Sequence, residues 1–357
     1  FVLYSSALSA GQVASVNTEI SRSISAATLT LGGSNASTNF SGSIKDGNAA
    51  IALVKQGSGT QTLSGTNSYS GNTTVNAGSL TIGSSGTLGS GSYAGALSVA
   101  SGATFNWNSS AIQTFSNLAS GGTTGVVNFS GTGSNAVTIS GTQTFNGVVN
   151  VSQAVTMSGA SNAAAAGLGS ATTIEIKNGG TITLAGPDNA FIGWTAAPNV
   201  IIDQGGTLTT ASNNYSFHLG TVTLNGGTLA YGPNGTTTLG SVGCAYQCGS
   251  YLLDKQITVA ADSTISAIGV SLTQTGGTVF DVAGAKTLTV SGYFYNSPDA
   301  GVADNGLVKQ GAGTMAMTNA NNNYGSATTI KAGILSISAD SGLGAAPGSA
   351  TAGNIVF

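Results

Sequence analysis

The sequence predicts an all-β chain wound as a β-solenoid of about 15 coils. Three observations lead to this fold class: charged residues make up only 5% of the 357 residues, a Gly-Gly-Thr-apolar motif returns at regular intervals, and apolar and polar residues alternate between the motifs. A soluble globular domain usually carries about a quarter charged residues. Here 55 glycines and many Ser, Thr and Asn fill the polar positions instead. Such a chain buries apolar strands and meets water through hydroxyl and amide groups.

The Gly-Gly-Thr motif sets the period of the expected coil. Its second glycine falls at Gly180, Gly206 and Gly227, at spacings of 26 and 21 residues. A unit of about 20 to 30 residues is typical of one coil of a β-solenoid. Since parallel strands stack about 4.8 Å apart, about 15 coils give a rod near 70 Å long.

Short alternating segments mark the strands of the expected coils. The clearest are Ala27–Leu31, Val137–Ser140, Val148–Val151, Val222–Leu224 and Leu288–Val290. Period-two alternation with many β-branched residues is the strand pattern, and we expect the inward side chains to stack in rows from coil to coil. Gly-Gly, Asn-Gly and Ser-Gly pairs fit the corners, where φ is positive. No domain boundary is visible, so residues 1–357 are predicted to form a single solenoid.

One long pattern occurs twice. The first copy, residues 53–82, begins Leu-Val-Lys-Gln-Gly-Ser-Gly-Thr, and the second, residues 307–337, begins Leu-Val-Lys-Gln-Gly-Ala-Gly-Thr. Each has a central tyrosine, Tyr69 or Tyr324, and each ends in an Ala-Gly pair followed by a strand-like segment. The second copy departs from the first at Met317, where leucine is usual. The pattern resembles the passenger-associated repeat of bacterial autotransporters.

This resemblance implies a fold and a location. It implies a right-handed, single-stranded parallel β-helix that is exported to the outside of a Gram-negative-type cell. It does not imply one particular activity.

Charge and hydropathy narrow the function classes. Between Lys55 and Glu175 there is no Asp, Glu, Lys or Arg, but this stretch contains no run of about 18 apolar residues that could span a membrane. The eight basic residues are scattered singly and the net charge is −3, so we expect no nucleic-acid partner. No metal or cofactor motif is present, and no cofactor is predicted.

The two cysteines lie close together in the segment 243–251, which we expect to protrude as a loop. In an exported protein, Cys244 and Cys248 at this spacing suggest a disulfide. Two free thiols are the alternative. A zinc site is a third interpretation, in which His218, the sole histidine, would join both thiolates.

An enzyme that acts on polysaccharides is the competing interpretation, because such enzymes also use parallel β-helices. Glycoside hydrolysis needs two carboxylates about 5 to 10 Å apart. Adjacent coils can bring Asp188 near Asp203, or Asp254 near Asp262 and Asp281. The plainer interpretation is that these residues cap turns. A lyase would need basic residues, yet Arg22 is the only arginine.

Histidine chemistry of the serine-hydrolase kind is not expected. His218 could serve a catalytic triad, but no Gly-x-Ser-x-Gly motif accompanies it. We expect an outward-facing or coil-end histidine.

Two sets of residues are candidates for contacts with other molecules. Tyrosines in one part of the chain could form a contact surface, namely Tyr246, Tyr251, Tyr293 and Tyr295. The chain begins with Phe1, Val2, Leu3 and Tyr4, which we interpret as a first strand, and ends with Ile355, Val356 and Phe357. These apolar ends carry no charge or proline to prevent strand pairing, so we expect head-to-tail self-association. A fragment cut from a longer solenoid would show the same ends.

These observations together predict a non-enzymatic, extracellular β-helix with a structural or adhesive role at the bacterial cell surface. The expected partners are copies of itself in a filament, glycans or neighbouring cell surfaces. The structure can separate this interpretation from the enzyme by showing whether two carboxylates share an exposed cleft on one face of the solenoid.

Overall fold

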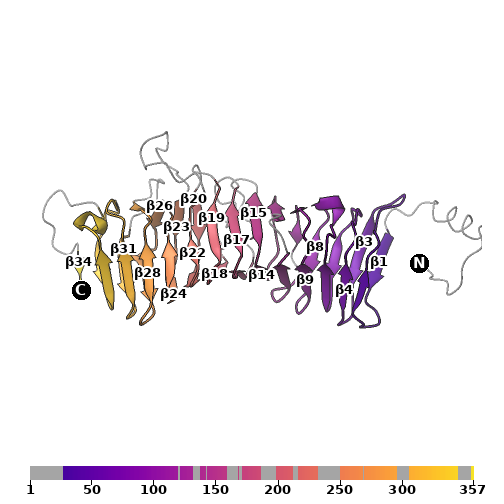
Figure 1. Ribbon diagram of the computed structural model, residues 1–357, viewed down its shortest axis with the longest axis horizontal. Coiled ribbons are helices and arrows are strands. Elements are labelled where there is room, and N and C mark those ends of the chain that lie inside the picture. Colours follow the sequence, from indigo (N-terminus) through magenta and orange to yellow (C-terminus); the bar gives the residue numbers. More distant parts are fainter. Residues whose placement is uncertain are drawn as a thin grey trace, which may run out of the picture.

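The computed structural model describes residues 27–119, 121–131, 137–141, 143–158, 168, 171–185, 198–211, 216–231, 250–267, 269–295, 305–344 and 355–357. These residues form a long rod in which β1 (Ala27–Leu31) and β34 (Ile355–Val356) lie at opposite ends (Figure 1). Strands of successive coils pair in parallel, which confirms the predicted parallel β-solenoid. In this described part, no helix is long and apolar enough to cross a membrane.

The rod has three sides, and most coils contribute a described strand to two or three of them. Within the described ranges, side 1 consists of a five-stranded and a four-stranded sheet, side 2 of a 14-stranded sheet and side 3 of an 11-stranded sheet. The five-stranded sheet holds β1, β3 (Ile51–Lys55), β5 (Thr73–Val75), β8 (Leu97–Val99) and β11 (Leu118–Ala119). The four-stranded sheet holds β20 (Ser216–Leu219), β23 (Ser250–Leu253), β26 (Gly269–Leu272) and β29 (Phe294–Tyr295).

Sides 2 and 3 run along most of the rod. Side 2 holds β2 (Thr38–Phe40), β4 (Thr60–Leu63), β6 (Ser79–Ile82), β9 (Thr104–Trp107), β12 (Val126–Phe129), β14 (Val148–Val151), β16 (Thr173–Ile176), β18 (Asn199–Asp203), β21 (Val222–Asn225), β24 (Ile257–Ala261), β27 (Thr278–Val282), β30 (Leu307–Gln310), β32 (Thr328–Ile330) and β34. Side 3 holds β7 (Ser92–Tyr93), β10 (Gln113–Phe115), β13 (Val137–Ser140), β15 (Ala154–Ser158), β17 (Thr181–Leu184), β19 (Thr207–Thr210), β22 (Thr228–Leu229), β25 (Ser263–Ile265), β28 (Thr287–Val290), β31 (Thr314–Met317) and β33 (Ile334–Ile337). Two short 3₁₀ turns, η1 (Gly89–Gly91) and η2 (Asp340–Leu343), follow the two copies of the long pattern.

Alternation along each strand decides which side chains enter the core. In β17, Ile182 and Leu184 are fully buried while Thr181 and Thr183 are half-buried on the outside. Burying such an aliphatic side chain stabilises the fold by roughly 1.5 to 3 kcal/mol. The predicted strands Ala27–Leu31, Val137–Ser140 and Val148–Val151 coincide with β1, β13 and β14.

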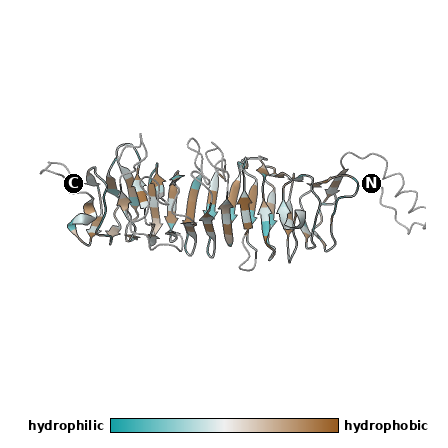
Figure 2. Cartoon of the chain, turned by 90° about the horizontal axis from the view of Figure 1, so that it is seen from above, coloured by the Kyte–Doolittle hydropathy of each residue, from teal (hydrophilic) through white to brown (hydrophobic). Residues whose placement is uncertain are grey.

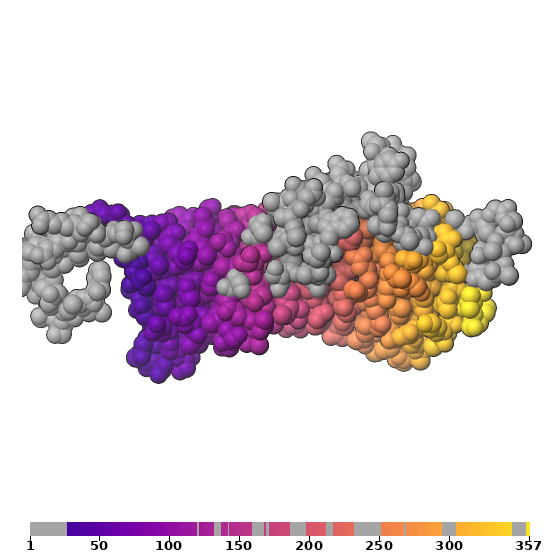
Figure 3. Space-filling model, turned by 180° about the vertical axis from the view of Figure 1, so that it is seen from behind, coloured from indigo at the N-terminus to yellow at the C-terminus, as the bar shows by residue number. Residues whose placement is uncertain are grey.

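The inward residues stack in rows along the rod, as the sequence predicted. One row on side 2 consists of residues with at most 1% of their surface exposed, each paired with the next: Leu63, Ile82, Trp107, Phe129, Val151, Ile176, Ile202, Leu224, Val259 and Val282. Hydrophobic residues are accordingly spread along the whole rod (Figure 2). The surface colours follow the sequence from one end to the other, because each coil lies against its neighbours in sequence (Figure 3).

The solenoid has about 11 turns, fewer than the predicted 15 coils. In the described part, end rungs such as β2, β4 and β34 contribute to side 2 without a partner strand in the side 3 sheet. Coil length also varies. Val126 pairs with Val148, 22 residues on, whereas Val222 pairs with Ile257, 35 residues on.

Glycine is required at the corners because neighbouring coils approach closely there. A Cβ on Gly206 would lie 2.3 Å from the carbonyl oxygen of Ile176 in the preceding coil, closer than real Cβ contacts allow. The preceding Gly205 has a φ of 76°, which L-residues with a side chain rarely adopt. The Gly-Gly pair therefore fixes the corner in both conformation and space.

Candidate functional site

The first copy of the long pattern places a lysine in the core of the rod. Lys55 ends β3, and its side chain is fully buried. Its Nζ donates hydrogen bonds to the carbonyl oxygens of Gln56 at 2.8 Å, Gly57 at 2.8 Å and Ala77 at 3.0 Å. Gln56 and Gly57 form the corner of the same coil and Ala77 that of the next. One ammonium group therefore joins two successive corners.

The second copy makes the same arrangement. Lys309 in β30 is fully buried, and its Nζ donates to the carbonyl oxygens of Gln310 at 2.7 Å, Gly311 at 2.7 Å and Ala332 at 3.1 Å. Burial lowers the pKa of Lys55 and of Lys309, and the Asp281 carboxylate partly opposes the shift at Lys309. Three carbonyl oxygens match the three donors of an ammonium group. We call each such unit a lysine clamp, and its role is structural.

A buried asparagine follows each clamp, one side further along the coil. Asn67 accepts a hydrogen bond from the Ile44 N–H at 3.1 Å and donates to the carbonyl oxygens of Gly65 at 2.9 Å and Thr87 at 3.1 Å. It thus links three successive turns of backbone.

The second copy repeats the asparagine contacts and the tyrosine that follows. Asn322 accepts from the Phe294 N–H at 2.9 Å and donates to the Gly342 carbonyl oxygen at 2.8 Å. The hydroxyls of Tyr324 and Thr328 are 2.7 Å apart. In the first copy the hydroxyls of Tyr69 and Thr73 are also 2.7 Å apart.

The two copies occupy different sides of the rod. Strands β3 and β4 of the first copy lie on sides 1 and 2, whereas the equivalent β30 and β31 lie on sides 2 and 3. The repeat is therefore displaced around the axis by one side. Its internal contacts do not depend on which side it occupies.

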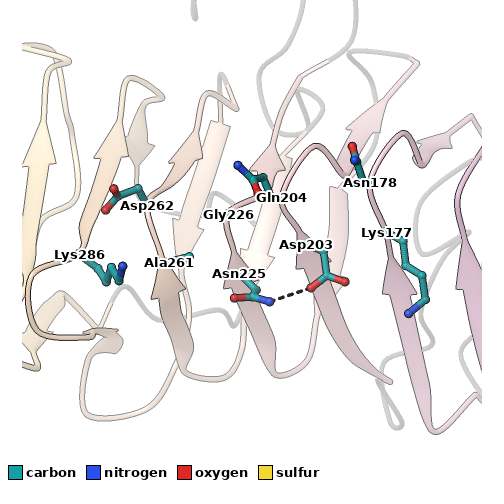
Figure 4. Close-up of a pocket in the computed structure, with 9 residues that line it drawn as sticks. All are labelled: Lys177, Asn178, Asp203, Gln204, Asn225, Gly226, Ala261, Asp262 and Lys286. Carbon is teal, nitrogen blue, oxygen red and sulfur yellow. Dashed lines mark hydrogen bonds between the residues drawn. The ribbon is translucent and has the colours of Figure 1, made fainter.

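A polar groove lies at the corner between sides 2 and 3, outside both copies (Figure 4). It has a volume of about 650 Å³ and crosses successive coils. Its lining residues are polar or small: Lys177, Asn178, Asp203, Gln204, Asn225, Gly226, Ala261, Asp262 and Lys286. We call it the corner groove.

Two carboxylates lie in the corner groove, two rungs apart. Asp203 pairs with Asn225 in the ladder, and Asn225 pairs with Ala261, which precedes Asp262. Two rungs correspond to about 10 Å along the rod. The Asn225 amide donates to Asp203 Oδ1 at 2.9 Å, and the Thr287 N–H donates to Asp262 Oδ1 at 2.7 Å.

Lysines lie toward the two ends of the groove. Lys177 forms an ion pair with Glu175 at 2.7 Å, and its side chain is 41% exposed. Lys286 lies beyond Asp262 (Figure 4). The groove therefore offers amides and charges of both signs, which suits an extended polar ligand better than a single ion.

The carboxylates predicted from the sequence are arranged differently. Asp188 lies outside the described residues. Asp254, Asp262 and Asp281 have separate partners: Asp281 Oδ2 accepts from the amides of Gln256 at 3.5 Å and Gln310 at 3.2 Å. The pair that shares a groove, Asp203 and Asp262, was not predicted.

The sole histidine contacts one of these carboxylates. His218 Nδ1 lies 2.6 Å from Asp254 Oδ2, and the Thr273 hydroxyl donates to Asp254 Oδ1 at 2.6 Å. The His218 side chain is only 12% exposed. Among the described residues, no group of three or more His, Cys, Asp and Glu could hold a metal ion.

The predicted tyrosine surface needs correction at Tyr251. Tyr251 is fully buried, its ring lies 6.5 Å from that of Phe217, and its hydroxyl donates to the Ala230 carbonyl oxygen at 3.1 Å. The inward phase of β23 places this aromatic ring in the core, so its assignment to a contact surface was wrong. Tyr293 is half-buried, and burial raises its pKa.

The other predicted site residues divide between the described part and the rest. Tyr246, Cys244, Cys248 and the segment 1–4 lie outside the described residues, and Tyr295 is described only as part of β29. Ile355, Val356 and Phe357 are 45%, 40% and 93% exposed.

Comparison with known proteins identifies the repeats. The family model of the passenger-associated transport repeat matches residues 53–82 and 307–337, the two copies that carry the lysine clamps. No curated protein and no solved structure matches the chain. By fold and repeats, the molecule is a parallel β-solenoid of the passenger-repeat class. The repeats and the parallel β-solenoid together support an autotransporter passenger domain, and the repeat family suggests a secreted or surface location.

Proposed function

We propose that this passenger acts by display and association rather than by catalysis. The rod presents polar sides to glycans or neighbouring cells at the bacterial outer surface, and copies join head to tail into a fibre. The observation that carries the proposal is an apolar rung left uncovered near the C-terminal end of the described residues.

The uncovered strands are β33 on side 3 and β34 on side 2, the last strand of each sheet in the described part. Ile334 is 58% exposed, and the inward-phase residues Leu335 and Ile337 are only partly buried. In the described part, β33 pairs with β31 and β34 pairs with β32, each along one edge. An edge strand with unpaired N–H and C=O groups is a template for another strand.

The other end of the described rod offers an apolar counterpart. A hollow of about 330 Å³ lies there, and its apolar lining residues are Leu29, Leu31, Phe40 and Ile44. Phe40 is 43% exposed. Since the two ends differ, their contact is heterologous and extends into a filament rather than closing as a dimer.

Light scattering and electron microscopy of the purified chain test the assembly. We expect fibres at high protein concentration, and we expect Ile334→Lys to abolish them because it places a charge in the proposed contact. Ile112→Lys is the matched control, since Ile112 is 65% exposed on the flank of the rod. Deletion of residues 1–10 tests the contribution of the opposite end. A monodisperse wild-type chain, or equal loss of fibres in both variants, contradicts the assembly.

A second candidate function is supported by the corner groove. Asp203 and Asp262 share it, which meets the criterion that we set for a polysaccharide-acting hydrolase. A spacing of about 10 Å lies at the upper limit for two catalytic carboxylates. Release of reducing ends from bacterial or host polysaccharides, lost in Asp203→Asn and in Asp262→Asn but kept in Asp340→Asn, would favour the enzyme. We expect no release by the wild-type chain.

A further inference from the structure

Side 3 carries a regular array of threonines on its outward surface. Two columns run along the rod, and in each column the residues pair rung by rung. The first column is Thr181, Thr207, Thr228, Thr264 and Thr289. The second is Thr114, Thr138, Thr156, Thr183 and Thr209. We call this array the threonine face.

The dimensions of the array follow from strand geometry. Neighbours within a column are about 4.8 Å apart, and Thr181 and Thr183, two residues apart on β17, are separated by about 6.6 Å. Each column covers five rungs, or about 19 Å, and the two overlap on β17 and β19. Together they extend about 34 Å from β10 to β28, along strands that lie side by side (Figure 1). All ten threonines are half-buried by their neighbours. Hydroxyl and methyl groups are therefore held in fixed positions.

The threonine face is uncharged and free of aromatic rings. Where the register continues the two columns beyond the threonines, it brings Ser92, Ala154, Ala316 and Ser336 into line. Charged side chains begin at the corner, with Asp262 and Lys286 of the corner groove. Strong β-propensity accounts for threonine in strands. It does not account for the uninterrupted runs of five on this side. The outward column of side 2 also has Thr62, Thr81, Thr223 and Thr258, but it interrupts them with residues such as Asn128, Glu175, Ile201 and Asp281.

The chemistry of this face limits its ligand. A hydrogen bond from a neutral hydroxyl to a soluble glycan replaces one to water, with a small net gain. Without an aromatic ring there is little apolar area to drive sugar burial, and a flexible chain loses entropy on ordering. A solid with a fixed lattice loses no such freedom, and weak contacts repeated in register add up.

From these properties we infer that the threonine face binds the surface of ice. The hydroxyl groups hold water molecules in a repeating pattern, and the methyl groups between them seat water without disrupting it. The rod supplies the rigidity, because every threonine lies on a strand bonded to strands on both sides. This activity is independent of the fibre contact and of the corner groove.

Thermal hysteresis and inhibition of ice recrystallisation test the inference on the purified chain. We expect the wild-type chain to show both and Thr183→Lys, at the centre of the array, to lose most of both. Thr223→Lys introduces the same charge at a half-buried outward position on side 2 and is expected to behave as wild type. Unchanged thermal unfolding of both variants establishes that they fold.

Two results overturn the inference. One is a folded wild-type chain with neither effect, and the other is equal loss in the two variants. Binding to crystalline cellulose or chitin is measured in parallel. Retention on such a solid that Thr183→Lys abolishes, in the absence of any effect on ice, assigns the face to crystalline polysaccharide and also overturns the inference.

Discussion

The two copies of the transport repeat make the same contacts in different surroundings. In the first copy, β9 stacks on β6, so Leu80 and Ile82 are fully buried. In the second copy, the equivalent Leu335 and Ile337 on β33 are only partly buried. Yet Lys55 and Lys309 donate to equivalent carbonyl oxygens. The repeat thus forms its own corner. The strand that covers its last strand lies outside the repeat.

The displacement around the axis supports the same conclusion. The repeat forms its clamp on side 1 in one copy and on side 2 in the other. The clamp contacts are the same on either side of the rod and with or without a covering strand. They therefore depend only on residues within the repeat and its own corners. The largest differences between the copies are therefore expected at the outer rung, and the smallest within the clamp and the rows that it supports.

The largest expected effect comes from placing a charge in the covered rung. Leu80→Asp buries an unpaired carboxylate, which costs several kcal/mol. Leu335→Asp is expected to cost far less in the monomer, because its carboxylate can reach water. Limited proteolysis should cut near residue 80 in the first variant while distant coils survive. Equal destabilisation by both substitutions would mean that β33 is covered as β6 is.

The second-largest loss of stability is expected from removing either lysine clamp. Lys55→Met and Lys309→Met should each destabilise the chain by about 2 kcal/mol, because buried carbonyl oxygens lose their donor. We expect the two losses of stability to be similar. Denaturant unfolding measures both, with the exposed Lys45→Met as a control expected within about 0.5 kcal/mol of wild type. A neutral result at Lys309 alone would show that the second clamp is not equivalent.

Alkaline pH should separate the two copies further. The Tyr93 hydroxyl donates to the Gly71 carbonyl oxygen at 2.6 Å and lies 2.7 Å from the Thr73 hydroxyl. Burial raises the pKa of Tyr93 from 10.0 to about 12. Since the folded-state pKa exceeds the unfolded value, stability is kept below about pH 10 and falls as pH rises through about 12. In hydrogen exchange at rising pH, Tyr93→Phe should weaken the pH dependence of the first copy, and an unchanged slope would contradict this assignment.

The smallest effect is expected within the buried rows. Met317 occupies the position that Leu63 has in the first copy, and both are buried. Met317→Leu conserves volume and should change stability by less than about 1.5 kcal/mol. Thermal unfolding measures it, and a larger loss would indicate that the row on side 3 requires the flexible side chain.

The sequence predicted the strands well because alternation directly reports which side chains are inward. Lys55 was recognised as part of the repeat, but its burial was not foreseen, since lysine is almost never fully buried unless paired. Its partners are backbone carbonyls, which sequence letters do not show. Tyr251 was misplaced for a related reason, because composition did not reveal the inward phase of β23.

The corner groove could not be derived from motifs. Asp203 and Asp262 come together because Val222 pairs with Ile257 across a 35-residue coil and the register shifts after Leu224. Coil length and register are properties of the pairing and not of any short motif.

In the proposed fibre, another molecule covers the open strand β33 of the second copy. Ile334 and Ser338 direct their N–H groups to Gly313 and Met317 on the β31 side, so those of Leu335 and Ile337, between them, point away from β31. Hydrogen exchange at these amides as a function of protein concentration tests this contact. We predict that exchange at Leu335 and Ile337 slows as concentration rises, while Leu80 and Ile82 stay protected throughout. Fast exchange at Leu335 and Ile337 at every concentration would contradict it.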